Sequence, residues 1–226
     1  MKNYKYLGVI AVLYATFAIM SNVTAGKIVE FGPLIVSVTV LFFPFTYIFS
    51  DIVTEVYGYA RARTLVWLML GVYTIAAVMA QIAVWVPGAT GFEHSAAYEV
   101  VLGSQWRIII ASLVAVWAGA LVNDYVLAKL KIWTAGALLW VRTIGSTIAG
   151  EGVNTVLFYS IALYGILPDG MLLTAVLSGW LLKVVVEIVM TPVTYKVVAA
   201  LKKAESEDYY DRDTNFNPFI VGSVKM

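Results

Sequence analysis

A carboxylic acid at the centre of a long apolar stretch is the residue of this sequence with the clearest chemical potential. Glu151 lies in RTIGSTIAGEGVNTVLFY, residues 142–159, which we expect to form a membrane-spanning helix. A charged side chain in the hydrocarbon region costs about 2.5–3.5 kcal/mol on insertion scales, so it usually faces a cavity or a partner. At a rise of about 1.5 Å per residue, Glu151 would lie about 13 Å beyond Arg142, close to the bilayer centre.

Small and polar side chains share the helix face that carries this carboxylate. At about 3.6 residues per turn, one stripe contains Thr143, Thr147, Gly150, Glu151, Asn154 and Phe158. Small residues beside a carboxylate leave room for a ligand, and they equally allow close contact with another helix. We expect a ligand site, and helix packing remains the alternative.

The last apolar segment carries a second intramembrane charge pair. Lys183 and Glu187 are four residues apart and share a stripe with Trp180 and Thr191. The two charges can neutralise each other within the helix, or Lys183 can reach across the bundle to Glu151. Either arrangement is costly in a membrane, which indicates a role in substrate binding, with neutralisation for structure alone as the alternative.

Residues spaced by four define one face of the second apolar segment: Phe43, Tyr47, Asp51 and Glu55. We expect the two acids near the cytoplasmic interface, where they are solvated, pair with Arg61 and Arg63, or form a cytoplasmic gate. Pro44 is expected to kink this helix.

Other polar residues are expected near the ends of the predicted helices. Asn22, at the outer end of the first segment, can contact a ligand, cap its helix or bond to another helix. Arg142 is expected to anchor the inner interface or to take part in the gate. Asn123 and Asp124 are expected to be interfacial, and His94 to be a solvated loop residue.

The composition requires an integral membrane protein. Of 226 residues, 61% are hydrophobic and 13% charged, more apolar than any soluble domain of this size needs. The sequence has no cysteine, and its net charge of +1 gives no basic excess that would indicate nucleic-acid binding. It also lacks a phosphate-binding GxxxxGK[ST] and an HExxH pattern, so we expect no cofactor, no metal and no enzymatic activity.

Apolar stretches long enough to cross about 30 Å of hydrocarbon lie at 6–25, 33–53, 64–86, 106–127, 141–164 and 171–200. We therefore predict an all-α bundle of six transmembrane helices over residues 1–203, followed by a polar, mobile cytoplasmic tail at 204–226. Lysine and arginine concentrate in the loops that share a side with the N-terminus, which predicts that both termini are cytoplasmic.

Two blocks of sequence carry a family resemblance. One is FPF at 43–45 followed by SDIVTEVYG at 50–58 and ARAR at 60–63, and the other is RTIGSTIAGEGVNTVLF at 142–158. Together with Ser21-Asn22 and the Lys183/Glu187/Thr191-Pro192 pattern, they resemble the queuosine precursor transporter family, also called the vitamin uptake transporter family, of prokaryotic inner membranes. The family often has Asp-Thr where this chain has Asn154-Thr155, so a charge is missing there.

The resemblance implies import of 7-deazaguanine precursors of queuosine, 7-cyano-7-deazaguanine or its aminomethyl relative, through the inner (plasma) membrane. A guanine-like edge has two adjacent N–H donors, which a carboxylate accepts as a bidentate pair. Glu151 is the expected acceptor, with Asn154 as a second polar partner. Phe158, Tyr47 or Phe45 can stack on the flat ring. A carboxylate without its ligand would bind a proton more readily, which permits proton-coupled uptake.

Alternatives of other classes stay open at this point. A six-helix chain of this size also suits a substrate-binding membrane subunit of an energy-coupling uptake complex, which needs a separate ATPase. A membrane enzyme would use Glu151 and Lys183 for acid–base work, but no nucleophile accompanies them. The expected partners are a small deazapurine and the lipid bilayer, without nucleic acid. Small residues such as those at 118–120 add the hypothesis of a homodimer.

Overall fold

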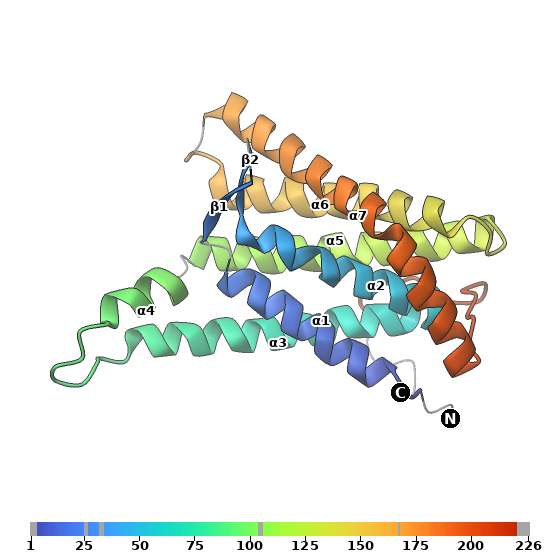
Figure 1. The fold of residues 1–226 in the computed structure, drawn as a ribbon, viewed down its shortest axis with the longest axis horizontal. Coiled ribbons are helices and arrows are strands. Elements are labelled where there is room, and N and C mark those ends of the chain that lie inside the picture. Colours follow the sequence, from blue (N-terminus) through green and yellow to red (C-terminus); the bar gives the residue numbers. More distant parts are fainter. Residues whose placement is uncertain (1–3, 25–26, 32–33, 104–105, 167, 221–226) are drawn as a thin grey trace.

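The computed structural model describes residues 4–24, 27–31, 34–103, 106–166 and 168–220, and most of them are helical (Figure 1). In chain order the elements are α1 (Leu7–Val23), β1 (Ile28–Phe31), β2 (Leu34–Ser37), the 3-10 helix η1 (Val38–Leu41), α2 (Phe43–Tyr57), α3 (Tyr59–Trp85), α4 (Ser95–Leu102), α5 (Trp106–Trp133), α6 (Leu139–Leu163) and α7 (Asp169–Glu205).

The long helices have the length and composition of membrane spans. Among the described residues, three helices are long and apolar enough to cross a bilayer: α3, α5 and α7. α1 is apolar but shorter, at 17 residues, and α2 has 15. α6 has 25 residues, and its polar stripe lowers its hydropathy. The chain is therefore a multi-pass membrane protein, and the count of six spans stays a prediction.

The first part of the second predicted helix is not helical. Residues 34–37 form β2, which pairs antiparallel with β1 in the register Ile28↔Ser37, and η1 follows. The helix predicted from residue 33 is therefore wrong for residues 34–37, although the bundle itself is all-helical. The sequence LIVSVTV at 34–40 is dominated by β-branched residues, which favour strands over helices. Pro44 lies in the first turn of α2, where its missing N–H breaks no bond, so it begins the helix instead of kinking it.

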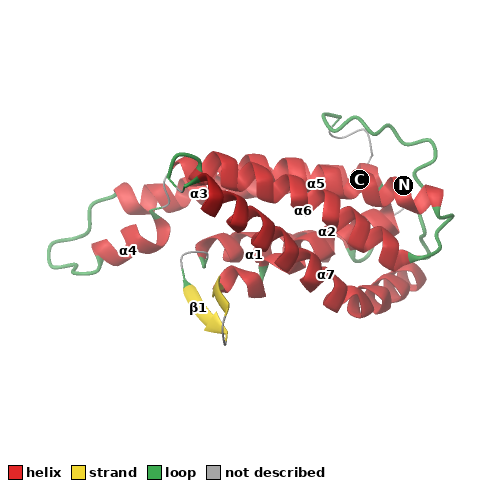
Figure 2. Ribbon diagram, turned by 90° about the horizontal axis from the view of Figure 1, so that it is seen from above, coloured by secondary structure: helices red, strands yellow, loops and turns green. Residues whose placement is uncertain are grey.

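The helices form a bundle in which α2 is central. α5 and α6 make the most extensive helix–helix contact, α7 packs on α6 and α2, and α1 packs on α2 and α3. α4 and the hairpin lie away from the described chain ends (Figure 1), and the hairpin projects from the helices (Figure 2). The Tyr4 hydroxyl donates to Glu207 at 2.8 Å, so both described ends meet at one end of the bundle. That this end is cytoplasmic stays a prediction.

Burial is concentrated on α2, and apolar exposure on α3 and α7. Twelve of the 15 residues of α2 are buried, including Asp51, Thr54 and Glu55. Large apolar side chains such as Met79 on α3 and Val189 on α7 are more than 60% exposed, as expected of a surface that faces lipid. The polar interior and apolar exterior place the chemistry of this protein inside the bundle.

A backbone-to-backbone crossing of α5 and α6 brings polar side chains together. A Cβ added at Gly150 would lie 2.5 Å from the Asn123 Cβ and 2.8 Å from the Gly119 carbonyl oxygen. A Cβ at Gly119 would lie 2.6 Å from the Asn154 Cβ. Only glycine fits at both positions, so this small-residue stripe serves contact within one chain.

The C-terminal segment packs against the helix ends, although the sequence predicts a mobile tail. The backbone N–H of Tyr209 donates to the Val56 carbonyl at 3.2 Å, and the Trp67 indole donates to the Pro218 carbonyl at 2.8 Å. The Arg63 guanidinium donates to the carbonyls of residues 215 and 217 at 2.8 and 2.6 Å. Backbone carbonyl groups of the segment thus accept hydrogen bonds from side chains of α3. The charged and aromatic composition of the segment does not predict these contacts.

We predict that Gly150→Ala lowers the thermal stability of the detergent-purified protein, because the added methyl must push apart the backbones of α5 and α6. Overpacking of this kind costs about 1–3 kcal/mol. Gly71→Ala on α3 is the matched control, since nothing lies within 4 Å of its added Cβ, and it should leave Tm unchanged or raise it. Equal Tm values for the two variants would contradict the close crossing.

Candidate functional site

A small cavity lies between α1, α2, α5 and α6 at the Glu151 side chain. Its volume is about 20 Å³, and its walls include Tyr14, Phe43, Tyr47, Asn123, Glu151 and Asn154. About 10–15 Å³ is enough for one water molecule, so this cavity accepts water but no bicyclic ring. The bundle must therefore widen around Glu151 before a heterocycle can enter.

The Glu151 carboxylate is paired with the ammonium group of Lys183 across the α6–α7 interface. The Lys183 Nζ lies 2.8 Å from Glu151 Oε2 and donates to Asn154 Oδ1 at 2.8 Å. It also donates to the Thr155 hydroxyl at 3.1 Å and lies 4.7 Å from the centre of the Phe43 ring. Of the two arrangements open from the sequence, the structure has the one in which Lys183 reaches Glu151.

A layer of buried polar side chains lies next to this cavity, between α2 and α5. The Asn123 amide donates to Asp51 Oδ1 at 2.5 Å. The hydroxyls of Ser50 and Thr54 donate to Asp124 Oδ1 at 2.8 and 3.0 Å. Asp51, Asp124 and Asn123 are buried, so these side chains face the interior of the bundle. That Asn123 and Asp124 lie at the depth of the membrane interface stays a prediction. Asn123 connects the cavity to this polar layer, because it lines the cavity and donates a hydrogen bond to Asp51.

Glu187 is the polar side chain with the least compensation in this region. It is completely buried, and neither of its carboxyl oxygens has a hydrogen-bond partner among the described residues. The ion pair with Lys183 that its spacing allows is absent, because the Lys183 ammonium points to Glu151 instead. Glu187 interacts electrostatically with Glu151 and Asp51, which are both acidic.

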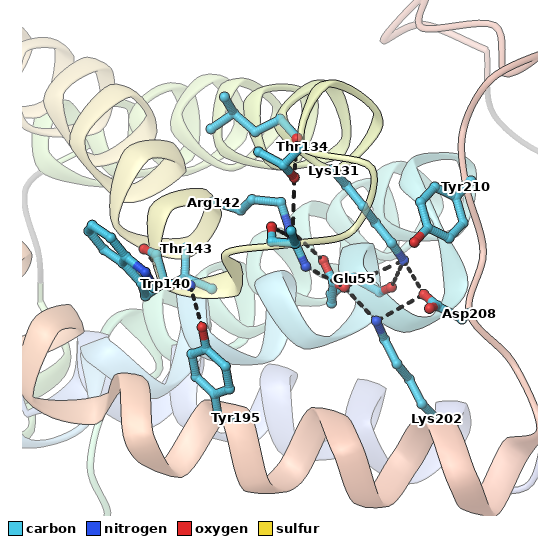
Figure 3. A network of polar contacts seen from close by, with 12 residues as sticks. Glu55, Lys131, Thr134, Trp140, Arg142, Thr143, Tyr195, Lys202, Asp208 and Tyr210 are labelled. Carbon is cyan, nitrogen blue, oxygen red and sulfur yellow. Dashed lines mark hydrogen bonds and ion pairs between the residues drawn. The ribbon is translucent and has the colours of Figure 1, made fainter.

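An ion-pair network lies at the end of the bundle at which the chain ends meet, and Figure 3 shows its side chains. We call it the inner cluster, and it consists of Glu55, Lys131, Arg142, Lys202 and Asp208. The Glu55 carboxylate receives Arg142 in a bidentate pair at 2.8 and 3.2 Å, and Lys202 at 2.6 Å. The Lys131 ammonium lies 3.5 Å from the same carboxylate. The cluster therefore joins α2, α5, α6 and α7 through one side chain.

The C-terminal segment contributes the second carboxylate of the inner cluster. Asp208 accepts from Lys131 at 2.5 Å and pairs with Lys202 at 2.9 Å. Burial opposes ionisation of Asp208, but the two ammonium groups outweigh it and hold the pKa of this carboxyl below its ordinary value. Lys131 also donates to the carbonyls of Glu55 and Tyr209 at 2.5 and 2.8 Å. The buried lysine is thus fully bonded.

Three residues predicted to contact the substrate, Asn22, Phe45 and Phe158, do not line the cavity. The Asn22 amide donates to the Tyr73 hydroxyl on α3, and the Phe45 ring packs on Phe17 at 4.7 Å. The Phe158 ring contacts Tyr159 at 5.5 Å. These positions fit helix packing.

Arg61, which the sequence predicts for the gate or an ion pair, lies in the first turn of α3. Its guanidinium donates to the Tyr57 carbonyl at 2.6 Å and lies over the Tyr4 ring at 4.6 Å. Pairing of Arg61 and Arg63 with Asp51 and Glu55 is not observed, because α2 turns those acids into the bundle.

Several residues of the site have no clear signal in the sequence. Tyr14 lines the cavity from α1, where an isolated tyrosine in an apolar run resembles any interfacial aromatic. Lys131 and Asp208 belong to the inner cluster, but charges at a helix end and in a polar tail usually contact water. Gly119, four residues before Asn123, is the signal that could have indicated close packing at that level.

We predict that Glu55→Gln lowers Tm strongly, because it leaves three cations of the inner cluster with only Asp208 as a charged partner. Breaking a buried ion pair in this way costs about 3–5 kcal/mol. Asp208→Asn is the matched comparison, since its side chain is 43% exposed against 1% for Glu55, so solvent screens its charge and its loss should cost clearly less. Similar losses in thermal unfolding of both variants would refute this ranking.

Comparison with known proteins shows which family and which relatives this chain is similar to. The family described as “Putative vitamin uptake transporter” matches residues 37–197. A Bacillus subtilis protein named “Probable queuosine precursor transporter” is 28% identical over 179 residues, 78% of each chain. A Haemophilus influenzae protein of the same name is 28% identical over 127 residues, 55% of this chain and 50% of that one. No solved structure matches this chain. Since the family match covers more than half of its residues, the chain belongs to the vitamin uptake transporter family.

Proposed function

We propose that this protein imports queuosine precursors, 7-cyano-7-deazaguanine or 7-aminomethyl-7-deazaguanine, through the inner membrane in a proton-coupled process. The observation that carries the proposal is the Glu151 carboxylate, which borders a cavity and is held by a lysine from another helix. The names of both relatives point to the same class of substrate.

The chemistry of the cavity suits a guanine-like edge. The ring N–H and the exocyclic amine of a deazaguanine are adjacent donors, and Glu151 can accept both in a bidentate pair. The ligand then replaces the Lys183 ammonium as partner of the carboxylate. Lys183 keeps the neutral acceptors Asn154 and Thr155, so its ammonium group still has hydrogen-bond partners after it leaves Glu151. Exchange of one donor for another keeps the cost of binding low.

Aromatic side chains at the cavity supply the second component of recognition. Phe43 and Tyr47 come from one face of α2, and Tyr14 faces them from α1. Stacking of a base on an aromatic ring is worth about 1–3 kcal/mol. The Tyr47 hydroxyl donates to the Lys183 carbonyl at 3.1 Å, so movement of the ring is tied to the helix that carries the lysine. A flat heterocycle that binds Glu151 on α6 and stacks on the α2 rings would separate α2 from α6.

Import also requires that the inner cluster open. This cluster lies at the end of the bundle that we expect to be cytoplasmic, and it holds α2, α5, α6 and α7 together. A ligand that wedges α2 away from α6 at the cavity would strain the Glu55–Arg142 pair on the same two helices. We propose that this pair is the inner gate.

We predict that Glu151→Gln weakens binding of 7-cyano-7-deazaguanine about 10–100-fold, because hydrogen bonds to a charged group contribute about 1.5–3 kcal/mol. Binding is measured as the ligand-induced rise in Tm of the purified protein. Glu93→Gln, in the exposed loop before α4, is the control and should bind normally. Full affinity in the Glu151 variant would end the proposed role of this carboxylate.

Reconstitution separates a transporter from a subunit of an energy-coupling complex. Liposomes that contain the purified chain alone, loaded with unlabelled 7-cyano-7-deazaguanine, should take up the radiolabelled compound by exchange. We expect exchange for the wild type and a tenfold or greater loss for Glu151→Gln. Tight ligand binding without any exchange would favour the substrate-binding subunit, which depends on a separate ATPase.

A further inference from the structure

We infer that Asp51 on α2 and Glu187 on α7 form a proton-binding site, which holds a proton while the bundle is closed and releases it when the bundle opens. The inference deepens the proposed function, because it names the groups through which uptake would respond to pH. Glu151 is not one of them, since it has a cationic partner.

The two carboxyl groups are buried, and the described residues give them neither a cation nor enough hydrogen-bond donors to stabilise a charge. Asp51 and Glu187 are both completely buried. Asp51 accepts one hydrogen bond, from Asn123, and its second oxygen has no partner among the described residues. Both oxygens of Glu187 lack a partner in that same part of the chain. An ionised carboxylate is rarely buried without a cation or several donors, so this arrangement is typical of a neutral acid.

The charges that face the pair form a second observation. Asp51 interacts with Glu187, Asp124 and Glu55, and Glu187 interacts with Glu151, so these electrostatic neighbours are all acids. Tyr47 on α2 also interacts with both acids, and its phenol supplies no positive charge. Two neighbouring carboxyl groups surrounded by further acids cannot both ionise in an interior of low dielectric.

The cations of the bundle are committed elsewhere. Lys183, one turn from Glu187 on α7, points to Glu151 and Asn154. Arg142 and Lys202 pair with Glu55 in the inner cluster. Among the described residues, no cation is bonded to Asp51 or Glu187. A proton is therefore the positive charge that can neutralise the pair.

The position of the pair links its proton to the movement of the bundle. Asp51 is bonded to Asn123, which lines the cavity, and Glu187 lies on the helix whose Lys183 holds Glu151. Separation of α2 from α7 would admit water to both carboxyl groups, solvate their charges and release the proton. Closing the bundle would require that the proton be taken up again. The closed form therefore becomes less favourable as pH rises.

The test compares Asp51→Asn/Glu187→Gln with the wild type and with Glu93→Gln, in two assays between pH 5 and 9. In the first, the ligand-free protein is melted. The folded wild type binds the proton more tightly than the unfolded chain, so its Tm should be highest at acid pH and fall as pH rises. The double variant should show a flatter profile and the higher Tm at alkaline pH.

In the second assay, exchange of neutral 7-cyano-7-deazaguanine is followed in liposomes at equal pH on both sides. Above the pH at which the pair loses its proton, the wild-type exchange rate should fall by up to about tenfold per pH unit, as expected for the loss of one proton. The double variant should exchange at a rate independent of pH. If the paired substitution prevents folding, Glu187→Gln alone should show a weaker pH dependence of exchange than the wild type.

The two proposals fail in different ways. A wild-type pH profile that survives in the double variant, in either assay, would overturn the proton site and leave the importer intact. Absence of ligand exchange at every pH would refute the importer, while the melting assay, which uses no ligand, would still test the proton site. Use of the neutral cyano compound excludes a salt bridge between the ligand and these acids as the cause of any loss.

Discussion

The need to neutralise carboxylates inside a low-dielectric bundle determines how these helices are arranged. α2, the most buried helix, carries Asp51 and Glu55, and each needs partners from other helices. Glu55 obtains three cations, from α5, α6 and α7. Asp51 obtains a single amide from α5. Since each partner lies on a different helix, satisfying the charges of α2 fixes its neighbours more strictly than apolar contact does.

The partners become weaker from the inner end toward the middle of the bundle, and this gradient suits a transport site. At the inner end the guanidinium of Arg142 donates two hydrogen bonds to the Glu55 carboxylate, a bidentate geometry that is rigid and specific. At the cavity, Lys183 holds Glu151 as a single point charge on a flexible stem and has other acceptors within reach. Glu187 has no partner among the described residues. The middle of the bundle is therefore the part in which a ligand or a proton can replace existing contacts at the lowest cost in free energy.

The sequence indicates the residues that are out of place in a membrane, but not the contacts that they make. The apolar background makes Glu151, Lys183 and Glu187 conspicuous, and spacing alone offers both arrangements of the lysine. Helix periodicity places them on a face and contains no information about the helix opposite. Burial of Asn123 depends on the crossing at Gly119 and Gly150, which is a property of two helices together. The hairpin escaped prediction because a β-branched apolar run suits a membrane helix and a strand equally well.

The inner cluster explains why the C-terminal segment is ordered against the bundle. Three cations that converge on one buried carboxylate carry a net positive charge of two, which would repel itself without further compensation. Asp208 reduces this excess to one and bridges the two lysines, whose ammonium groups lie 2.6 Å (Lys202) and 3.5 Å (Lys131) from the Glu55 carboxylate. Release of the segment would return Lys131 and Lys202 to mutual repulsion next to Glu55 and weaken the contact between α5 and α7. The segment that follows the last helix thereby becomes part of the structure that closes the inner end, and any opening at that end must either move it or exchange its aspartate for water.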